Sequence, residues 1–138
     1  QMTAKACRKE LQKIRETIGT VTEEPGVFFR IPGGEYNNEV LRTIYACGSY
    51  PVAWSVDSMD WKEYEASELV RQLLQSCTIR DGEILRFHGE GENTGEMVKL
   101  LHPRLKEEGY EAVTVSQMVY KDRYRMTTDG RQIPEKSK

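Results

Sequence analysis

The sequence has few of the residues that build disulfide or metal centres. Its 138 residues include three cysteines, Cys7, Cys47 and Cys77, and two histidines. The cysteines lie 40 and 30 residues apart, with no C-x-x-C pair and no nearby pair of histidines, so a zinc site built from them is not predicted. Their odd number argues against a fully disulfide-bonded domain. We therefore predict that they are small buried hydrophobic residues.

Long hydrophobic runs and an excess of one charge are also absent. No apolar stretch approaches the ~20 residues that span a membrane. The 20 Lys and Arg residues nearly balance the 22 Asp and Glu residues, which predicts neither a nucleic acid nor an anionic membrane surface as partner. No signal peptide is visible, but the chain starts with Gln1. We expect its natural start to be missing, which leaves its localisation open.

The spacing of the apolar residues predicts helices and strands in strict alternation. Helices are predicted over about 5–18, 38–48, 67–74 and 94–109, with a short one at 116–119, and strands over 27–30, 50–56, 84–87 and 112–115. Alternation of this kind implies an α/β fold of parallel strands with helices packed outside. A closed (β/α)8 barrel needs ~250 residues, so we predict an open sheet or about half a barrel over residues 1–120. We expect residues 121–138 to form a polar, flexible tail.

Polar side chains follow three of the predicted strands. Arg30 follows the first strand, Asp57 and Asp60 follow the second, and His88 follows the third. Because functional groups gather at the carboxyl ends of parallel strands, we predict that these residues converge on one pocket. Each has a simpler explanation by itself: a surface salt bridge for the arginine, turn capping for the aspartates and a structural role for the histidine.

Four segments resemble motifs of the polysaccharide deacetylases, the NodB-homology carbohydrate esterases of family 4. Phe29–Asn37 resembles the R-x-P motif and Trp54–Trp61 the W-S-x-D-x-x-D-W motif. Gly82–His88 resembles the G-x-I-x-L-x-H motif, and Gly109–Ser116 resembles the closing strand of that domain. Their order and spacing match from about Leu11 to Val119. The resemblance implies a partial (β/α) barrel of the NodB-homology type that lacks its N-terminal units.

The resemblance also implies an activity and roles for single residues. Enzymes of the family remove N- or O-acetyl groups from chitin, peptidoglycan, xylan or related glycans, and this suggests a secreted or cell-wall-associated protein that binds acetylated polysaccharide or oligosaccharide. By this comparison, His88 is the catalytic acid, Asp60 tunes it and Arg30 orients the catalytic base. The substrate-binding residues implied are Trp61, Gly33, Tyr36, Asp57 and Leu85.

Two family motifs are missing from the sequence. Neither T-F-D-D nor H-x-x-x-H occurs anywhere in it, and these carry the catalytic base and the metal ligands of the family. We therefore expect no metal ligand in this chain, although zinc or a similar divalent ion is expected in a complete family member. Two single positions also depart from the motifs: Gly33 replaces a tyrosine, and Arg86 replaces a leucine where the acetyl pocket should be apolar.

Three interpretations remain open at this point. The chain is a fragment of a metal-dependent glycan deacetylase, a degenerate glycan-binding module without catalysis, or an α/β domain in which the three polar clusters only stabilise loops. Coding sequence upstream of Gln1 discriminates between the first two, because T-F-D-D and H-x-x-x-H there favour the enzyme.

A partial barrel predicts self-association. It exposes the strand around Phe28 and the helix faces that further units would cover, and open strand edges and apolar patches pair with other chains. We expect sedimentation analysis of the purified chain to show dimers or larger species as its concentration rises. A monomer across a wide concentration range contradicts this expectation and indicates a self-sufficient domain.

Overall fold

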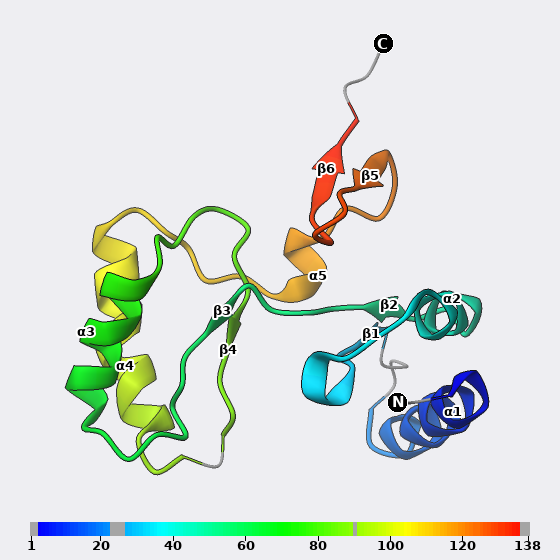
Figure 1. Ribbon diagram of the computed structural model, residues 1–138, viewed down its shortest axis with the longest axis horizontal. Helices are drawn as coiled ribbons and strands as arrows, with labels where there is room; N and C mark the ends of the chain where they lie inside the picture. Colours follow the sequence, from blue (N-terminus) through cyan, green and yellow to red (C-terminus); the bar gives the residue numbers. More distant parts are fainter. Residues whose placement is uncertain (1–2, 23–26, 90, 136–138) are drawn as a thin grey trace. The chain divides into compact units, whose positions relative to one another are not determined.

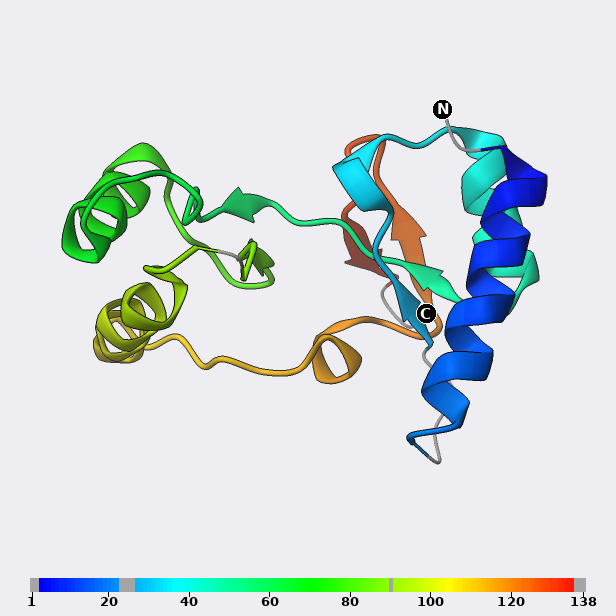
Figure 2. The ribbon, with the colours of Figure 1, turned by 90° about the horizontal axis from the view of Figure 1, so that it is seen from below.

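The computed structural model describes residues 3–22, 27–89 and 91–135, and these form two compact units. The first unit is Gln1–Ser55 and the second is Val56–Lys138. Each unit contains a short pair of parallel strands and a pair of helices (Figures 1 and 2). The mixture of helices and parallel strands is that of a partial α/β domain, as the sequence predicts. The division of the chain at residues 120 and 121 stays a prediction.

The first unit is built on two helices, α1 (Ala4–Gly19) and α2 (Asn38–Ala46). The Asn37 side chain begins α2 by accepting a hydrogen bond of 2.9 Å from the Val40 N–H, which satisfies one of the unpaired donors at a helix start. Strand β1 (Phe28–Phe29) pairs in parallel with β2 (Tyr50–Pro51), and the 3-10 helix η1 (Pro32–Gly34) follows β1. The buried core consists of Cys7, Leu11, Phe29, Ile31, Val40 and Ile44.

The second unit has its core between α3 (Ala66–Ser76) and α4 (Thr94–Glu107), which lie side by side in Figures 1 and 2. Strand β3 (Val56–Asp57) pairs in parallel with β4 (Leu85–Arg86). Val56 is opposite Leu85 and Asp57 is opposite Arg86. The buried apolar residues are Val56, Ala66, Leu69, Val70, Leu73, Met97 and Leu101. After α4 the chain runs through residues 110–114, which have no regular structure, into the short helix α5 (Val115–Met118).

Two of the predicted strands differ from the structure. The single strand predicted over 50–56 is divided into β2 and β3, which pair with different partners. The N–H groups of Tyr50 and Val52 donate to β1 and the residue before it, whereas those of Val56 and Ser58 donate to β4 and the residue before it. The strand predicted over 112–115 is not formed: residues 110–114 are irregular and Val115 begins α5. A strand needs a hydrogen-bonded partner, and the described residues provide none for this segment.

Regular structure also occurs where the sequence predicts a flexible tail. Strand β5 (Tyr124–Met126) pairs antiparallel with β6 (Gln132–Pro134). The Gln132 side chain anchors this hairpin by accepting from the Tyr120 N–H and donating to the Tyr120 carbonyl. The Asp129-Gly130 pair at the turn explains the hairpin, because Gly130 adopts the positive φ of 84° that such turns require.

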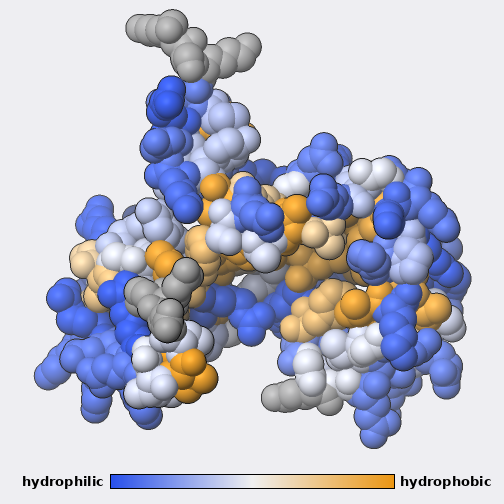
Figure 3. Space-filling model, turned by 180° about the vertical axis from the view of Figure 1, so that it is seen from behind, coloured by the Kyte–Doolittle hydropathy of each residue, from blue (hydrophilic) through white to orange (hydrophobic). Residues whose placement is uncertain are grey.

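Apolar side chains remain on the surface of both units. Figure 3 shows hydrophobic residues between hydrophilic areas on one face of the molecule. The exposed large apolar residues include Val21, Val27, Tyr45, Val98 and Met126. Whether such residues pair with a second copy of the chain stays a prediction. No helix in the described part of the chain is both long enough and apolar enough to cross a membrane.

We expect the second unit to depend on the fully buried Met97 side chain. Replacing Met97, which has 0% exposure in the core between α3 and α4, by alanine should lower the free energy of unfolding by about 2–5 kcal/mol, because it leaves a cavity. Urea unfolding followed by circular dichroism measures this loss. Val98→Ala is the matched control, since Val98 is on the same helix and 44% exposed. Equal losses for the two variants contradict the assigned core.

Candidate active site

The side chain of Asp60 is the centre of the polar cluster in the second unit. Asp60 lies in the turn after β3 and is 1% exposed. The Ser58 hydroxyl donates to Asp60 Oδ1 over 2.8 Å, and the Thr94 hydroxyl, at the start of α4, donates to Oδ2. The His88 N–H donates to both oxygens, over 3.0 and 3.1 Å. One carboxylate therefore joins the segment after β3, the segment after β4 and the first residue of α4.

The charge on Asp60 is stabilised although the group is buried. Burial raises the pKa of a carboxyl group, but the hydrogen bonds from Thr94, His88 and Ser58 more than offset burial and lower the pKa of Asp60 below its ordinary value. The carboxylate therefore stays ionised at neutral pH. It is a fixed negative charge beside the imidazole of His88.

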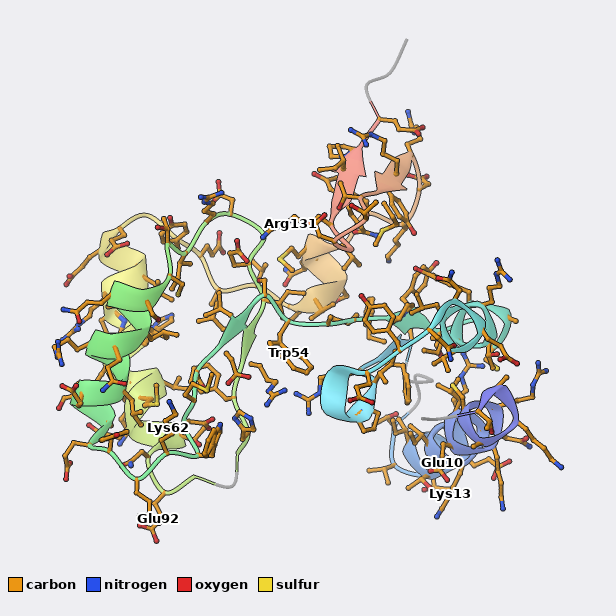
Figure 4. All side chains as sticks on the ribbon, in the orientation of Figure 1. Glu10, Lys13, Trp54, Lys62, Glu92 and Arg131 are labelled. Carbon is orange, nitrogen blue, oxygen red and sulfur yellow. The ribbon has the colours of Figure 1, made fainter. Side chains whose placement is uncertain are left out.

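The ring of His88 is bound to this carboxylate through one nitrogen. His88 Nδ1 lies 2.7 Å from Asp60 Oδ1, and the His88 side chain is 23% exposed. The indole of Trp61 meets the imidazole edge-on, with ring centroids 6.4 Å apart, and is 56% exposed. Lys62, labelled in Figure 4, lies over the same indole at 5.9 Å. A partly exposed imidazole that is held by a buried carboxylate is suited to proton transfer.

Arg86 brings a positive charge to the same place. Its Nη2 atom lies 3.2 Å from Asp57 Oδ2, and the same atom contacts Nε2 of His88. The pairing of Asp57 with Arg86 between β3 and β4 puts the two side chains next to each other. The sequence predicts that Asp57 and Leu85 bind substrate, whereas Leu85 packs against the apolar core. Its role in substrate binding stays a prediction.

A close approach at Gly91 also shapes the site. A Cβ atom at this position would collide with the main-chain carbonyl oxygen of Asp60. Only glycine allows the segment before α4 to come this near to the turn after β3. The contact keeps Thr94 within reach of the Asp60 carboxylate.

The remaining predicted site residues lie in the first unit. The guanidinium of Arg30 lies over the ring of Trp54, 6.0 Å from its centroid, at cation–π distance. Trp54, labelled in Figure 4, also packs against Gly34, where a Cβ would come within 2.8 Å of the ring. Gly33 has a positive φ of 73° in η1, and Tyr36 is 53% exposed. Trp54 therefore supports the segment that carries Arg30. The sequence did not predict this role for Trp54.

Several contributors to the cluster around Asp60 were not predicted. Ser58 and Thr94 donate to the carboxylate, and Arg86 contacts the imidazole. A serine two residues before an aspartate is a weak signal of a local hydrogen bond, but the contact of Thr94 spans 34 residues and leaves no local pattern. Within the described ranges, no three His, Cys, Asp or Glu side chains come together as a metal site would require. These residues do not fit the divalent ion that the family resemblance implies.

We expect Asp60→Asn to cost the second unit about 2–4 kcal/mol, because an amide cannot accept all the donors that now face the carboxylate. The pKa of Asp60 is lower in the folded state than in the unfolded state. Its contribution to the free energy of unfolding is therefore fully present above the unfolded pKa of ~3.9 and disappears as the pH falls through the folded pKa. Urea unfolding of both proteins between pH 7 and the acid limit should show the difference shrinking with falling pH. Asp81→Asn, an exposed control, should change stability by less than about 0.5 kcal/mol. A difference that is constant with pH contradicts this assignment.

No model of a known protein family matches the chain. It is 30% identical over 121 residues to the peptidoglycan-N-acetylglucosamine deacetylase PgdA of Listeria monocytogenes, covering 86% of this chain and 25% of that protein. It is 32% identical over 102 residues to a peptidoglycan-N-acetylglucosamine deacetylase of Bacillus cereus, covering 70% of this chain and 46% of that protein. The chain therefore spans between a quarter and a half of the length of these relatives.

The fold is similar to solved structures of the CE4 family. A CE4 family pseudoenzyme from Bacillus anthracis matches 85% of this chain and 41% of its own, with 26% identity and a TM-score of 0.77. Sequence and structural relatives thus agree with the four motifs that run in order along the chain. The chain is a partial polysaccharide deacetylase domain of the CE4 family.

Proposed function

We propose that the protein containing this chain removes acetyl groups from a cell-wall glycan, with the N-acetylglucosamine of peptidoglycan as the first substrate to test. The contact that supports this proposal most directly is the hydrogen bond of 2.7 Å between the buried Asp60 carboxylate and the ring of His88. A histidine held by a carboxylate is a common proton-transfer pair. The names of the Listeria and Bacillus relatives support the substrate class.

His88 has the role of proton donor in this proposal. When the bond between the acetyl carbon and the glycan nitrogen or oxygen breaks, the leaving atom needs a proton. Asp60 fixes the ring through Nδ1 and stabilises the imidazolium. The proton then leaves from Nε2, the nitrogen on the other side of the ring.

The other predicted residues have supporting roles in the proposal. Trp61 gives the sugar an apolar wall, consistent with its exposed indole beside the imidazole. Arg30 orients a base supplied from elsewhere, and the backbone at Gly33 binds the oxyanion. Tyr36, Asp57 and Leu85 contact the glycan. These assignments come from the family motifs. Because the proposed substrate is a glycan of the cell wall, the proposal also places the protein's action at the cell wall.

A second function is a glycan-binding module without catalysis. The similarity to a CE4 family pseudoenzyme favours it, as does the arginine that faces Nε2 of His88. A mutant of that pseudoenzyme with restored enzymatic activity has the same TM-score of 0.77 to this chain, so the fold by itself is compatible with both functions. If this second function is correct, the protein binds acetylated chito-oligosaccharide and releases no acetate from it.

We expect His88→Ala to lower kcat/KM for acetate release by roughly 10²–10⁴-fold in the protein that contains this chain, which is the usual contribution of a positioned acid or base. The assay uses acetylated peptidoglycan fragments and chito-oligosaccharides. His102→Ala is the matched control, because His102 is the other histidine and is exposed on α4. Near wild-type turnover in His88→Ala removes the acid role. Binding without any turnover in the wild type favours the second function.

A further inference from the structure

The hydrogen bonds of the His88 ring determine which of its nitrogens carries the proton. An arginine guanidinium is a donor only and has no acceptor atom. Arg86 Nη2 contacts His88 Nε2, so Nε2 must be the acceptor and carries no proton in this contact. The proton of the ring is then on Nδ1, which faces Asp60 Oδ1 at 2.7 Å, an acceptor. Both contacts are satisfied together only by the neutral tautomer with Nδ1 protonated.

The geometry of Arg86 accounts for both of its contacts. The Nη2 atom carries two hydrogens, and it has two acceptors, Asp57 Oδ2 at 3.2 Å and His88 Nε2. The parallel pairing of β3 with β4 puts Asp57 opposite Arg86, and the next side chain on the same face of the chain is that of His88. The side chains of Arg86, Asp57 and His88 are 20%, 21% and 23% exposed, so water screens their contacts only in part.

We propose that Arg86 is a positioning residue that locks His88 as a neutral hydrogen-bond acceptor. The charged groups that face this ring are Asp60 through Nδ1 and Arg86 through Nε2, and Asp57 faces Arg86. Asp60 favours a protonated ring, whereas Arg86 opposes a proton on Nε2, because an Nε2–H would point at another donor and place two positive charges in contact. While Arg86 is in place, Nε2 accepts a proton poorly and has none to give.

The consequence for catalysis rests on the proposed function, in which His88 donates from Nε2. In that reaction the guanidinium must first move away from the ring. Arg86 occupies the position where the family motif has a leucine, and a leucine makes no hydrogen bond with Nε2. The lock therefore separates this chain from relatives that have the leucine, and it predicts weaker proton donation by His88 although both Asp60 and His88 are present.

Nitrogen-15 NMR of the histidine rings tests the lock without relying on activity. The chain has two histidines, so a labelled sample gives two ring systems, and His102→Gln assigns them. We expect wild-type His88 to show a protonated, pyrrole-like Nδ1 and an unprotonated, pyridine-like Nε2 at neutral pH. In Arg86→Leu, Nε2 loses this donor, and its signal should move toward the pyrrole-like position as the ring exchanges between its two tautomers.

Arg71→Leu is the control for removing an arginine from an ion pair, because Arg71 pairs with Glu68 on α3 and does not touch the imidazole. It should leave the His88 spectrum unchanged. The backbone amide spectrum checks that each variant is folded. If Arg86→Leu does not fold, the wild-type spectrum still decides, since a proton on Nε2 of wild-type His88 overturns the lock. An unchanged His88 spectrum in folded Arg86→Leu overturns it too.

The activity of the complete protein separates this inference from the proposed function. If both are correct, Arg86→Leu raises kcat by up to roughly 10²–10⁴-fold, which is the usual contribution of a working general acid. A shift in the His88 spectrum with no change in acetate release supports the lock and contradicts the acid role of His88. No shift in the spectrum contradicts the lock, whatever the activity.

Discussion

The buried negative charge of Asp60 is the constraint on which the second unit depends. Moving a carboxylate out of water is costly unless donors replace the water. Here the donors come from Ser58, the backbone and ring of His88 and the hydroxyl of Thr94. Ser58 is close to Asp60 in the sequence, whereas His88 and Thr94 are 28 and 34 residues away from it. The ends of β3 and β4 and the start of α4 are therefore held at one point by the same requirement that keeps the charge stable.

The same arrangement connects stability with chemistry. Four side chains contact one another in a row, with a carboxylate at each end: Asp57, Arg86, His88 and Asp60. A change in any one of these groups alters the hydrogen bonds that its neighbour can make. Asp60 favours a proton on Nδ1 of His88, whereas Arg86 opposes a proton on Nε2. The acid role proposed for His88 depends on the balance of these two contacts rather than on the histidine alone.

The helices and the positions of the polar residues could be predicted from sequence because their signals are local. Apolar residues three and four apart gave helices close to α1, α2, α3 and α4. Asp57, Asp60 and His88 were placed at strand ends by the same reasoning, and these three lie in the connected cluster of the second unit. The Asp129-Gly130 turn signal was present as well and could have predicted the β5–β6 hairpin.

The sequence by itself determined the α/β class, the helices, the deacetylase motifs and the residue types available for chemistry, since each of these depends on neighbouring residues. Tertiary structure alone decided which strands exist and what each polar atom touches. Residues 112–115 have a strand pattern but no pairing partner among the described residues, so they form no strand. Thr94 reaches Asp60 across 34 residues. The contact of Arg86 with His88 Nε2 follows from the conformations of both side chains beside the Asp57–Arg86 pair. No sequence pattern encodes this contact, because a hydrogen bond between side chains depends on the positions of their atoms in space.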